Sequence, residues 1–351
     1  MECTVFRNDD PSWDEFVTSH PTGTFFHLLK WRNILHKSFG YESMYLCVRE
    51  AGQIRGVLPL FLVKSLLFGR SLVAMPVGVY GGPIGTDERS IETLLQEASI
   101  LAKECHVRYL EIRGNPYAGS AILPDLNGDA SRWSRKDLYV TFMSEIESTD
   151  EGNLARIPRK QRRMVRQGDK HGLRAIFDNG RLREFYGVYA ESVRNLGTPV
   201  YGYSYFENLM ASFGDQCKIL LVKHHEKIVA GVLSFFYRDQ VLPYYGGALK
   251  EYFQLAPNDF MYWELMRYAG AQGFKIFDFG RSKEGTGSYN FKRHWGFEPR
   301  PLPYWYYAPN GQALPDTSPL NPKLQWAIRI WRGLPLKITN SLGPHIVRHI
   351  P

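Results

Sequence analysis

An internal repeat constrains this fold more than any other feature of the sequence. Sliding the 351-residue chain along itself by 174 positions makes nine of the 32 positions from Gly23 to Ile54 identical, where average residue usage gives roughly two. With small gaps the match continues through three more pairs of segments: IRGVLPLF with IVAGVLSFF, VYGGPIG with YYGGALK, and HVRYLEIRG with FKIFDFGR. A repeat of this length predicts two similar units in tandem.

The two copies also share the order of their expected elements. Each has a helical segment, strands interrupted at Gly52-Gln53 or Glu226-Lys227, a Gly-Gly bend, a helix and a further strand. In the second copy we expect Asn258 or Asp259 to cap the helix FMYWELMRYAGAQG, which should end near Gly273. Antiparallel strands followed by helix, strand, helix and terminal strand are typical of GNAT-type acyltransferases.

The chain length fits this arrangement, because single cores stop growing well below 351 residues. We predict an α/β fold of mixed α+β layers, made of two tandem GNAT-like acyltransferase domains. The expected boundaries are 1–150 for the first domain, 151–310 for the second, and 311–351 for a basic C-terminal tail with an amphipathic helix.

Composition excludes several classes of protein. Hydrophobic residues make up 44% and charged residues 22%, which is typical of a folded globular chain. The four cysteines are far apart, and adjacent His224 and His225 would point to opposite faces of a strand, so we predict neither a disulfide framework nor a metal site. The N-terminus lacks the apolar run of a signal peptide, and the cytoplasm is the expected location.

The net charge of +8 is concentrated in two segments. Residues 154–174 carry +7 and residues 322–351 carry +5, which leaves −4 for the rest. The first segment predicts a cationic helix after Pro158. It either packs a stripe of Ile157, Met164 and Val165 on the body or binds a polyanion such as tRNA, a nucleotide diphosphate or anionic lipid.

The second basic segment, LQWAIRIWRGLPLK, places tryptophans beside arginines. This pattern is typical of an interfacial amphipathic helix, which would give 322–351 a peripheral contact with the inner face of the membrane. The alternative is a helix that docks Trp326 and Trp331 on the protein body.

Several motifs resemble the FemAB family. The segments YYGGA, FDFGRSKEGTGSYNFKRHWGFEP and LPYWYY are similar to its C-terminal half, KQRRMVRQGDKHGL to its K-x-RR-x-x-R pattern, and FYGVYAESVRNLGTP to the helix that follows. The resemblance spans most of 20–310 and is strongest to FemAB-like proteins associated with PEP-CTERM/exosortase and exopolysaccharide loci. It implies N-acyl transfer, with an amino acid moved from aminoacyl-tRNA to an amine of a peptidoglycan or exopolysaccharide precursor.

Three residues are the expected catalytic set. Lys292 matches the lysine of the family's FK motif, and its ammonium could stabilise the developing oxyanion or the leaving 3′-oxygen. Phe291 matches the same motif and could position Lys292 or offer its backbone carbonyl to the amine. Asp278 ends a buried strand, where a carboxylate needs a partner such as Arg281 or a substrate amine. His294 is either a base or a packing histidine beside Trp295.

Other residues are expected to bind substrate. Strand alternation should place one of Tyr244 and Tyr245 inside and the other in the cleft. Arg194 aligns with a family arginine at the acceptor site, and Lys37 occupies the corresponding region of the first copy. Without the resemblance, Arg194 could equally be a surface arginine at a helix end, and the alternative for Phe291 and Lys292 is a core and a surface residue.

The absence of one motif bears on the identity of the acyl donor. Acetyl-CoA enzymes of this fold hold pyrophosphate with a Q/R-x-x-G-x-G/A loop, whereas GGALKEYFQLAPND lacks the spaced glycines. This argues against ordinary acyl-CoA use and is compatible with aminoacyl-tRNA. Three readings stay open: a FemAB-like aminoacyl or acyl transferase, an acyl-CoA-dependent N-acyltransferase with a degenerate loop, and a non-catalytic polysaccharide- or nucleic-acid-binding relative.

Overall fold

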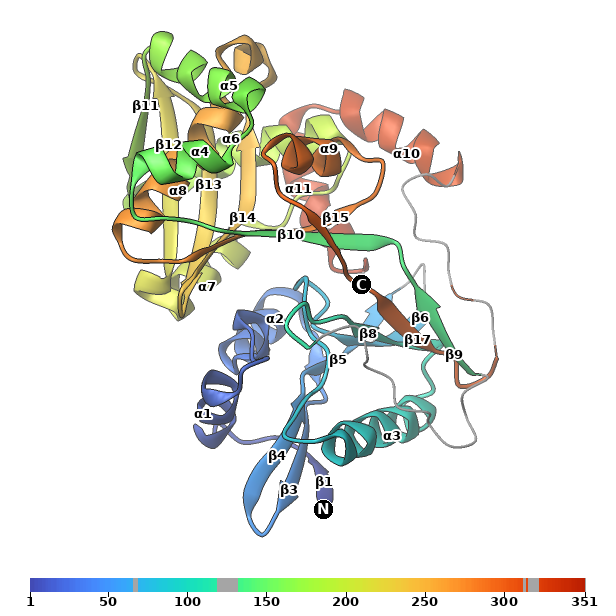
Figure 1. The fold of residues 1–351 in the computed structure, drawn as a ribbon. Helices are drawn as coiled ribbons and strands as arrows, with labels where there is room; N and C mark the ends of the chain where they lie inside the picture. Colours follow the sequence, from blue (N-terminus) through green and yellow to red (C-terminus); the bar gives the residue numbers. More distant parts are fainter. Residues whose placement is uncertain (66–68, 119–131, 312–313, 315–321, 351) are drawn as a thin grey trace. The chain divides into compact units, whose positions relative to one another are not determined.

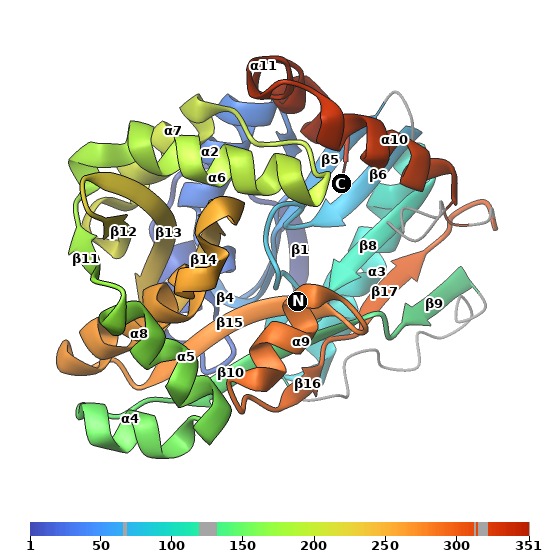
Figure 2. The same cartoon turned by 90° about the horizontal axis from the view of Figure 1, so that it is seen from above.

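The computed structural model describes residues 1–65, 69–118, 132–311, 314 and 322–350 (Figures 1 and 2). The chain divides into two compact units of mixed α/β structure, as predicted. Unit 1 comprises 1–140, 301–317 and 348–351, and unit 2 comprises 141–300 and 318–347. The part of the chain after residue 300 is therefore divided between the two units.

Unit 1 contains a four-stranded sheet in the order β1-β3-β4-β7 and a six-stranded sheet in the order β2-β5-β6-β8-β17-β9. Strands β6 and β8 run parallel. Its elements are β1 (Glu2–Val5), α1 (Ser12–Ser19), η1 (Phe25–His27), α2 (Lys30–Phe39), β2 (Glu42–Ser43), β3 (Leu46–Glu50), β4 (Gln53–Leu58), β5 (Leu60–Ser65), β6 (Gly69–Ala74), β7 (Ile84–Gly85), α3 (Glu88–Glu104), β8 (Tyr109–Arg113), β9 (Trp133–Lys136) and β17 (Tyr304–Tyr307).

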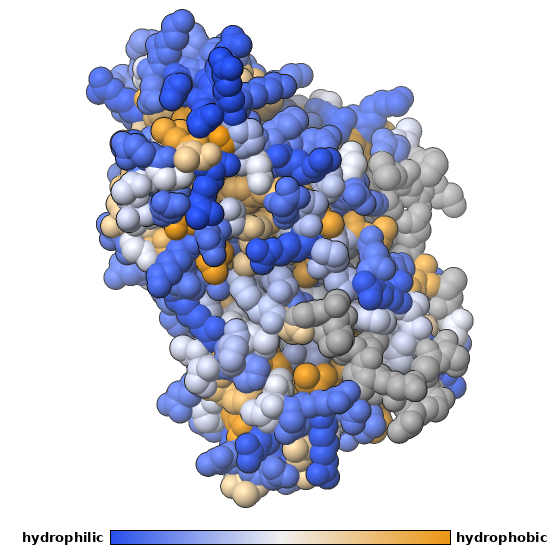
Figure 3. All heavy atoms as spheres, viewed as in Figure 1, coloured by the Kyte–Doolittle hydropathy of each residue, from blue (hydrophilic) through white to orange (hydrophobic). Residues whose placement is uncertain are grey.

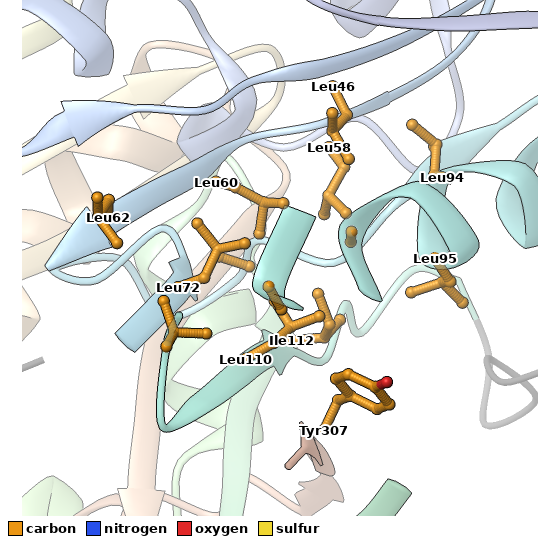
Figure 4. Packing of buried hydrophobic residues seen from close by; sticks show 14 of the residues in the cluster. Leu46, Leu58, Leu60, Leu62, Leu72, Leu94, Leu95, Leu110, Ile112 and Tyr307 are labelled. Carbon is orange, nitrogen blue, oxygen red and sulfur yellow. The ribbon is translucent and has the colours of Figure 1, made fainter. Parts of the chain in front are cut away.

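The core of unit 1 lies between α3 and the strands (Figure 4). Leu94 and Leu95 of α3 and Leu110 and Ile112 of β8 belong to one buried cluster. The helix begins where the Asp87 side chain accepts a hydrogen bond from the Ser90 amide at 2.7 Å. An amphipathic helix capped in this way buries its apolar face against the sheet.

Unit 2 is built on one seven-stranded sheet in the order β11-β12-β13-β14-β15-β10-β16. Neighbours from β11 to β14 are antiparallel, and β14 and β15 are parallel. The elements are β10 (Tyr139–Glu145), α4 (Asp150–Arg156), α5 (Arg159–Lys170), β11 (Leu173–Phe177), η3 (Asn179–Arg181), α6 (Leu182–Leu196), α7 (Tyr203–Phe213), η4 (Gly214–Gln216), β12 (Cys217–His224), β13 (Lys227–Tyr237), β14 (Gln240–Ala248), η5 (Lys250–Leu255), α8 (Pro257–Ala271), β15 (Ile276–Lys283), α9 (Gly287–His294), β16 (Pro299–Pro301), α10 (Pro322–Gly333) and α11 (Leu336–Val347).

The central strands of unit 2 are buried on both faces. Nine consecutive residues of β13 are buried, and the strand contacts α6 as well as α8. Figure 2 shows these two helices on opposite sides of β12 to β14. A continuous run of branched and aromatic residues is what a strand covered by helices on both faces requires.

Two strand exchanges depart from the simple order of the repeat. Strand β10, within the predicted first domain 1–150, lies in the sheet of unit 2, and β17, within the predicted second domain 151–310, lies in the sheet of unit 1. The boundaries 1–150, 151–310 and 311–351 remain predictions.

The predicted cap of α8 is wrong. The helix starts at Pro257 after Ala256, which adopts φ +55° without a side-chain cap, so Asn258 and Asp259 lie inside the first turn. Proline suits the first helical position because the amide it lacks would have no intrahelical partner there. Within the described residues, no helix is long and apolar enough to cross a membrane.

Candidate active site

The site begins with a local bend in β15. Gly280 adopts φ +67°, a left-handed conformation that favours glycine, and its amide donates a 2.7 Å hydrogen bond to Oδ1 of buried Asp278. Strands β14 and β15 pair only at Gln240–Ile276 and Val241–Phe277, before this point. The bend makes the carbonyl groups of Gly280 and Arg281 available to the neighbouring helix α9.

The side chain of Lys292 is hydrogen-bonded to these two carbonyl groups. Its Nζ donates to the oxygens of Gly280 and Arg281, each at 3.0 Å, and lies 5.8 Å from the centre of the Phe142 ring. Helix α9 starts where the Thr286 hydroxyl accepts from the Tyr289 amide. The ammonium is therefore fixed against the strand.

The surroundings of Lys292 change its protonation. Desolvation lowers the pKa of Lys292 from 10.5 to about 7, the Asp278 carboxylate opposes this shift, and the Arg281 guanidinium adds to it. Lys292 as a whole residue is only partly buried, whereas its ammonium is surrounded closely enough for desolvation to dominate its pKa. A lysine that titrates near neutral pH is suited to electrostatic or proton-transfer catalysis.

Phe291 lies on a groove beside this lysine. The groove has a volume of about 430 Å³ between α5, the start of α8 and α9. Phe291 also packs 5.6 Å from the ring of Tyr262, whereas Lys292 is not among the residues that line the groove. The lining residues are Pro158, Lys160, Gln161, Met164, Asp259, Phe291, Arg293 and His294. The lining of the groove thus combines apolar side chains with the cationic side chains of Lys160 and Arg293.

The cationic helix forms as predicted, over Arg159–Lys170. Gln161, Val165 and Gly168 are buried, and a Cβ at Gly168 would lie 2.6 Å from Phe260 of α8. Of the predicted stripe, Ile157 and Val165 are buried and Met164 is partly buried, and Gln161 and Gly168 extend the buried side of the helix. Six cations are exposed and make no ion pair within the described residues: Arg159, Lys160, Arg163, Arg166, Lys170 and Arg174.

The start of α8 is unlike a pyrophosphate site. Asp259 in the first turn accepts a hydrogen bond from Nε2 of Gln161, and burial raises the pKa of Asp259. Pro257 contributes no amide donor. A carboxylate at a helix N-terminus occupies the place where a phosphate would bind, and when ionised it would repel one. This pair has no motif in the sequence and was not predicted.

The two tyrosines, Tyr244 and Tyr245, do not point to opposite sides as alternation predicts, because their ring centres are only 4.8 Å apart. Tyr245 is buried, its hydroxyl lies 2.7 Å from the hydroxyl of Tyr205, and burial raises the pKa of Tyr245 well above its usual value. Tyr244 is half-buried and is the extra residue of a bulge, because Leu233 pairs with Tyr245 and Ser234 with Pro243. Which of them contacts substrate remains a prediction.

The remaining predicted residues, Arg194 and Lys37, belong to helices α6 and α2. Arg194 is in the last turn of α6, where it donates to the Leu334 carbonyl at 3.3 Å and to Asn195 Oδ1 at 3.1 Å. Lys37 is exposed on α2 of unit 1. The structure thus brings together Lys292, Asp278 and Arg281 next to Phe291, and gives Arg194 contacts with the C-terminal segment instead. No described group of His, Cys, Asp and Glu side chains could hold a metal ion.

Comparison with known proteins shows which proteins share this fold. Residues 154–293, from α4 to α9, match the acetyltransferase (GNAT) domain family. A lipid II:glycine glycyltransferase of Staphylococcus haemolyticus is 24% identical over 81% of this chain and 87% of its own length. The solved structure of FemX superposes with a TM-score of 0.66 at 19% identity, over 87% of this chain and 97% of that one.

A tandem GNAT protein from the clavulanic acid biosynthesis pathway shares the fold with a TM-score of 0.54 at 12% identity, over 89% of this chain and 99% of its own. The chain is therefore a tandem GNAT protein and an acyltransferase of that superfamily. Within the superfamily the similarities support the FemAB family, which the motifs had indicated.

Proposed function

We propose that this protein transfers an amino acid from aminoacyl-tRNA to an amine of lipid II or a closely similar lipid-linked peptidoglycan precursor, at the cytoplasmic side of the membrane. The single observation that carries the chemistry is Lys292, an enclosed ammonium with a pKa of about 7 held by two strand carbonyls. The distant similarity to lipid II:glycine glycyltransferases supports the substrate class.

The reaction requires charge stabilisation at one oxygen. The acceptor amine attacks the ester carbonyl carbon and an oxyanion forms. The bond to the ribose 3′-oxygen then breaks as that oxygen takes up the proton that the amine nitrogen loses. An ammonium has three donors, and the carbonyls of Gly280 and Arg281 use two. The third N–H of Lys292 would donate to the oxyanion or to the leaving oxygen, where low polarity strengthens the interaction.

Asp278 and Phe291 would support this lysine. The negative charge of Asp278 opposes the loss of the Lys292 proton, so the carboxylate favours the cationic form that the oxyanion needs. Phe291 lies on the groove and would direct the incoming amine through its ring or its backbone carbonyl. Arg281, Tyr244, Tyr245, Arg194 and Lys37 remain proposed substrate contacts.

The basic segment 154–174 would bind the tRNA. Six exposed cations without ion pairs in the described structure provide phosphate contacts, and Lys160 is shared with the groove that Phe291 lines. Asp259 at the start of α8 disfavours the acyl-CoA alternative, because its carboxylate would face the pyrophosphate. An exopolysaccharide amine, the acceptor suggested by the PEP-CTERM resemblance, is the alternative acceptor.

Donor consumption tests this proposal. Purified protein is incubated with lipid II and either charged tRNA or acetyl-CoA, and the product amide is followed by mass spectrometry. Deacylation of the tRNA together with one added aminoacyl group on lipid II is the expected result. Consumption of acetyl-CoA alone would replace the donor, and transfer only to an amino-sugar polymer would replace the acceptor.

A further inference from the structure

The C-terminal helices α10 and α11 dock on unit 2 by one side only. Trp331 and Val347 are buried, Arg332 donates to the Leu196 carbonyl at 3.1 Å, and both helices contact α6. A Cβ added at Gly343 would lie 2.9 Å from the backbone of Val200. Figure 2 shows the pair along the outside of α6. Of the two tryptophans in this segment, Trp331 lies on the buried side.

The other side of each helix exposes large apolar residues. Trp326 is 70% and Ile330 46% exposed on α10, and Ile338 is 42% and Leu342 47% exposed on α11. Each pair is four residues apart and therefore lies on one face of its helix. Of the ten exposed large hydrophobic side chains in the described chain, these four and Ile350 fall within the last 26 residues.

All charged residues of the same segment are basic. Residues 322–351 contain five Lys and Arg and no Asp or Glu. Arg329 and Lys337 are exposed and make no ion pair in the described part of the chain. Cations next to an exposed tryptophan and aliphatic side chains are complementary to a surface with anionic head groups over hydrocarbon.

From this combination we propose that α10 and α11 form a peripheral docking site for anionic lipid membranes. Trp326 and Ile330 would enter the boundary between head groups and acyl chains, with Ile338 and Leu342 on the second helix. Arg329 and Lys337 would neutralise lipid phosphates. The inference does not depend on the proposed aminoacyl donor or acceptor, because it concerns lipid binding by the full chain alone.

Vesicle co-sedimentation tests the docking site. Full-length protein is centrifuged with phosphatidylcholine vesicles, with or without about one third phosphatidylglycerol, at low and high salt. We expect binding to the anionic vesicles that weakens with salt. The double variant R329A/K337A should bind about 25-fold more weakly, since each cation near an anionic surface contributes roughly 5-fold.

Removing the apolar face should have a separate effect. The variant W326S/I330S should lose at least about 10-fold in vesicle binding, because the apolar area that enters the lipid is gone. The matched control is F253S, which removes a side chain that is 51% exposed on η5, and it should bind as the wild type does.

Three results would overturn the site: no difference between the two vesicle types, unchanged binding by W326S/I330S, or equal loss in F253S. A dimer that forms without vesicles and is abolished by W326S/I330S would assign the face to a second copy of the chain instead. Tryptophan fluorescence that fails to shift to shorter wavelength on vesicle addition would likewise contradict insertion of Trp326.

Discussion

The two repeats place a buried carboxylate at the same position and partner it with different cations. Glu111 is the third residue of β8 and Asp278 the third residue of β15, and each strand runs parallel to its neighbour in the sheet. In unit 1, Glu111 accepts from Arg113 Nε at 2.8 Å. In unit 2, Asp278 accepts from the Gly280 amide and lies close enough to Lys292 to affect its pKa.

The chemical difference between these cations separates a structural role from a catalytic one. Nη1 of Arg113 also donates to the carbonyls of Met75, Pro76 and Gly78 at 2.5 to 2.8 Å. Arginine keeps its proton in proteins, so the Glu111–Arg113 pair does not change its charge near neutral pH and has a structural role. Lysine shifts its pKa readily when enclosed, so the corresponding place in unit 2 can change its charge near neutral pH.

The antiparallel strands of the two units differ as well, in whether they are interrupted. In unit 1 both antiparallel strands are interrupted, at Pro59 between β4 and β5 and over residues 75–83 between β6 and β7. In unit 2 the corresponding strands β13 and β14 stay continuous, and the pairing between them is shifted once, by a bulge at Tyr244. Arg113 fixes the longer interruption, whereas the bulged strand of unit 2 requires no such arginine.

The largest effect that could break this comparison is on stability. R113M should cost about 3 to 5 kcal/mol in the free energy of unfolding, because it leaves the Glu111 carboxylate buried without its cation. Chemical denaturation measures this loss. The double variant E111L/R113M should recover much of it, and a loss below about 1 kcal/mol for R113M would show that the pair is not a clamp.

The next largest effect is on catalysis. K292M should lower kcat by about 100- to 1000-fold, since it removes the charge proposed to stabilise the oxyanion, and should leave the unfolding free energy unchanged or raised. Single-turnover transfer and denaturation measure the two quantities. K275M, an exposed lysine just before β15, is the matched control and should keep its activity.

Titration of the lysine sharpens the contrast further. The pKa of Lys292 is lowered, so the side chain is charged below about pH 7 and neutral above it, and kcat should fall as pH rises through about 7. Because Asp278 raises that pKa, D278N should move the descending limb to lower pH. An unmoved limb in the pH–kcat profile would exclude Lys292 as the titrating group.

The same shift predicts how stability depends on pH. Between about pH 7 and the unfolded value of 10.5, the unfolded chain binds a proton at Lys292 that the folded chain does not. The unfolding free energy of the wild type relative to K292M should therefore rise with pH across this window and stay constant below it. Denaturation at several pH values checks the sign.

The smallest effect concerns the cationic helix α5, which lies outside the aligned part of the repeat. R163A/R166A should weaken tRNA binding and reduce the slope of log affinity against log salt by about 2, one for each lost phosphate contact. The wild type and R163A/R166A can also be compared in transfer from a short aminoacylated acceptor stem, which has fewer phosphates than a whole tRNA. An unchanged slope would place the tRNA elsewhere.

Much of the fold could be predicted because the internal repeat gives the same order of elements twice. The strands follow from periodicity and repeated segments, and the cationic helix from its pattern of charges. The predicted bend at Gly246-Gly247 is wrong, because β14 continues through both residues. The exchange of β10 and β17 could not be predicted, because either sheet offers a compatible edge and local pattern does not choose between them.

The site was predicted in part. The resemblance selected Lys292, and burial of a carboxylate selected Asp278, which the structure places beside it. The two lysine acceptors could not be predicted, because they are backbone carbonyls exposed by the left-handed Gly280. Arg194 was chosen by alignment alone, and its contact with Leu334 depends on a tail outside the repeat.

The lysine anchor in β15 has an evolutionary consequence. Since both acceptors of the Lys292 ammonium belong to the main chain, no exchange of a neighbouring side chain can delete them. Only a change that reshapes the strand, above all at Gly280, would remove the anchor. Descendants of this protein can therefore alter the side chains that select a substrate while inheriting the reactive group in place.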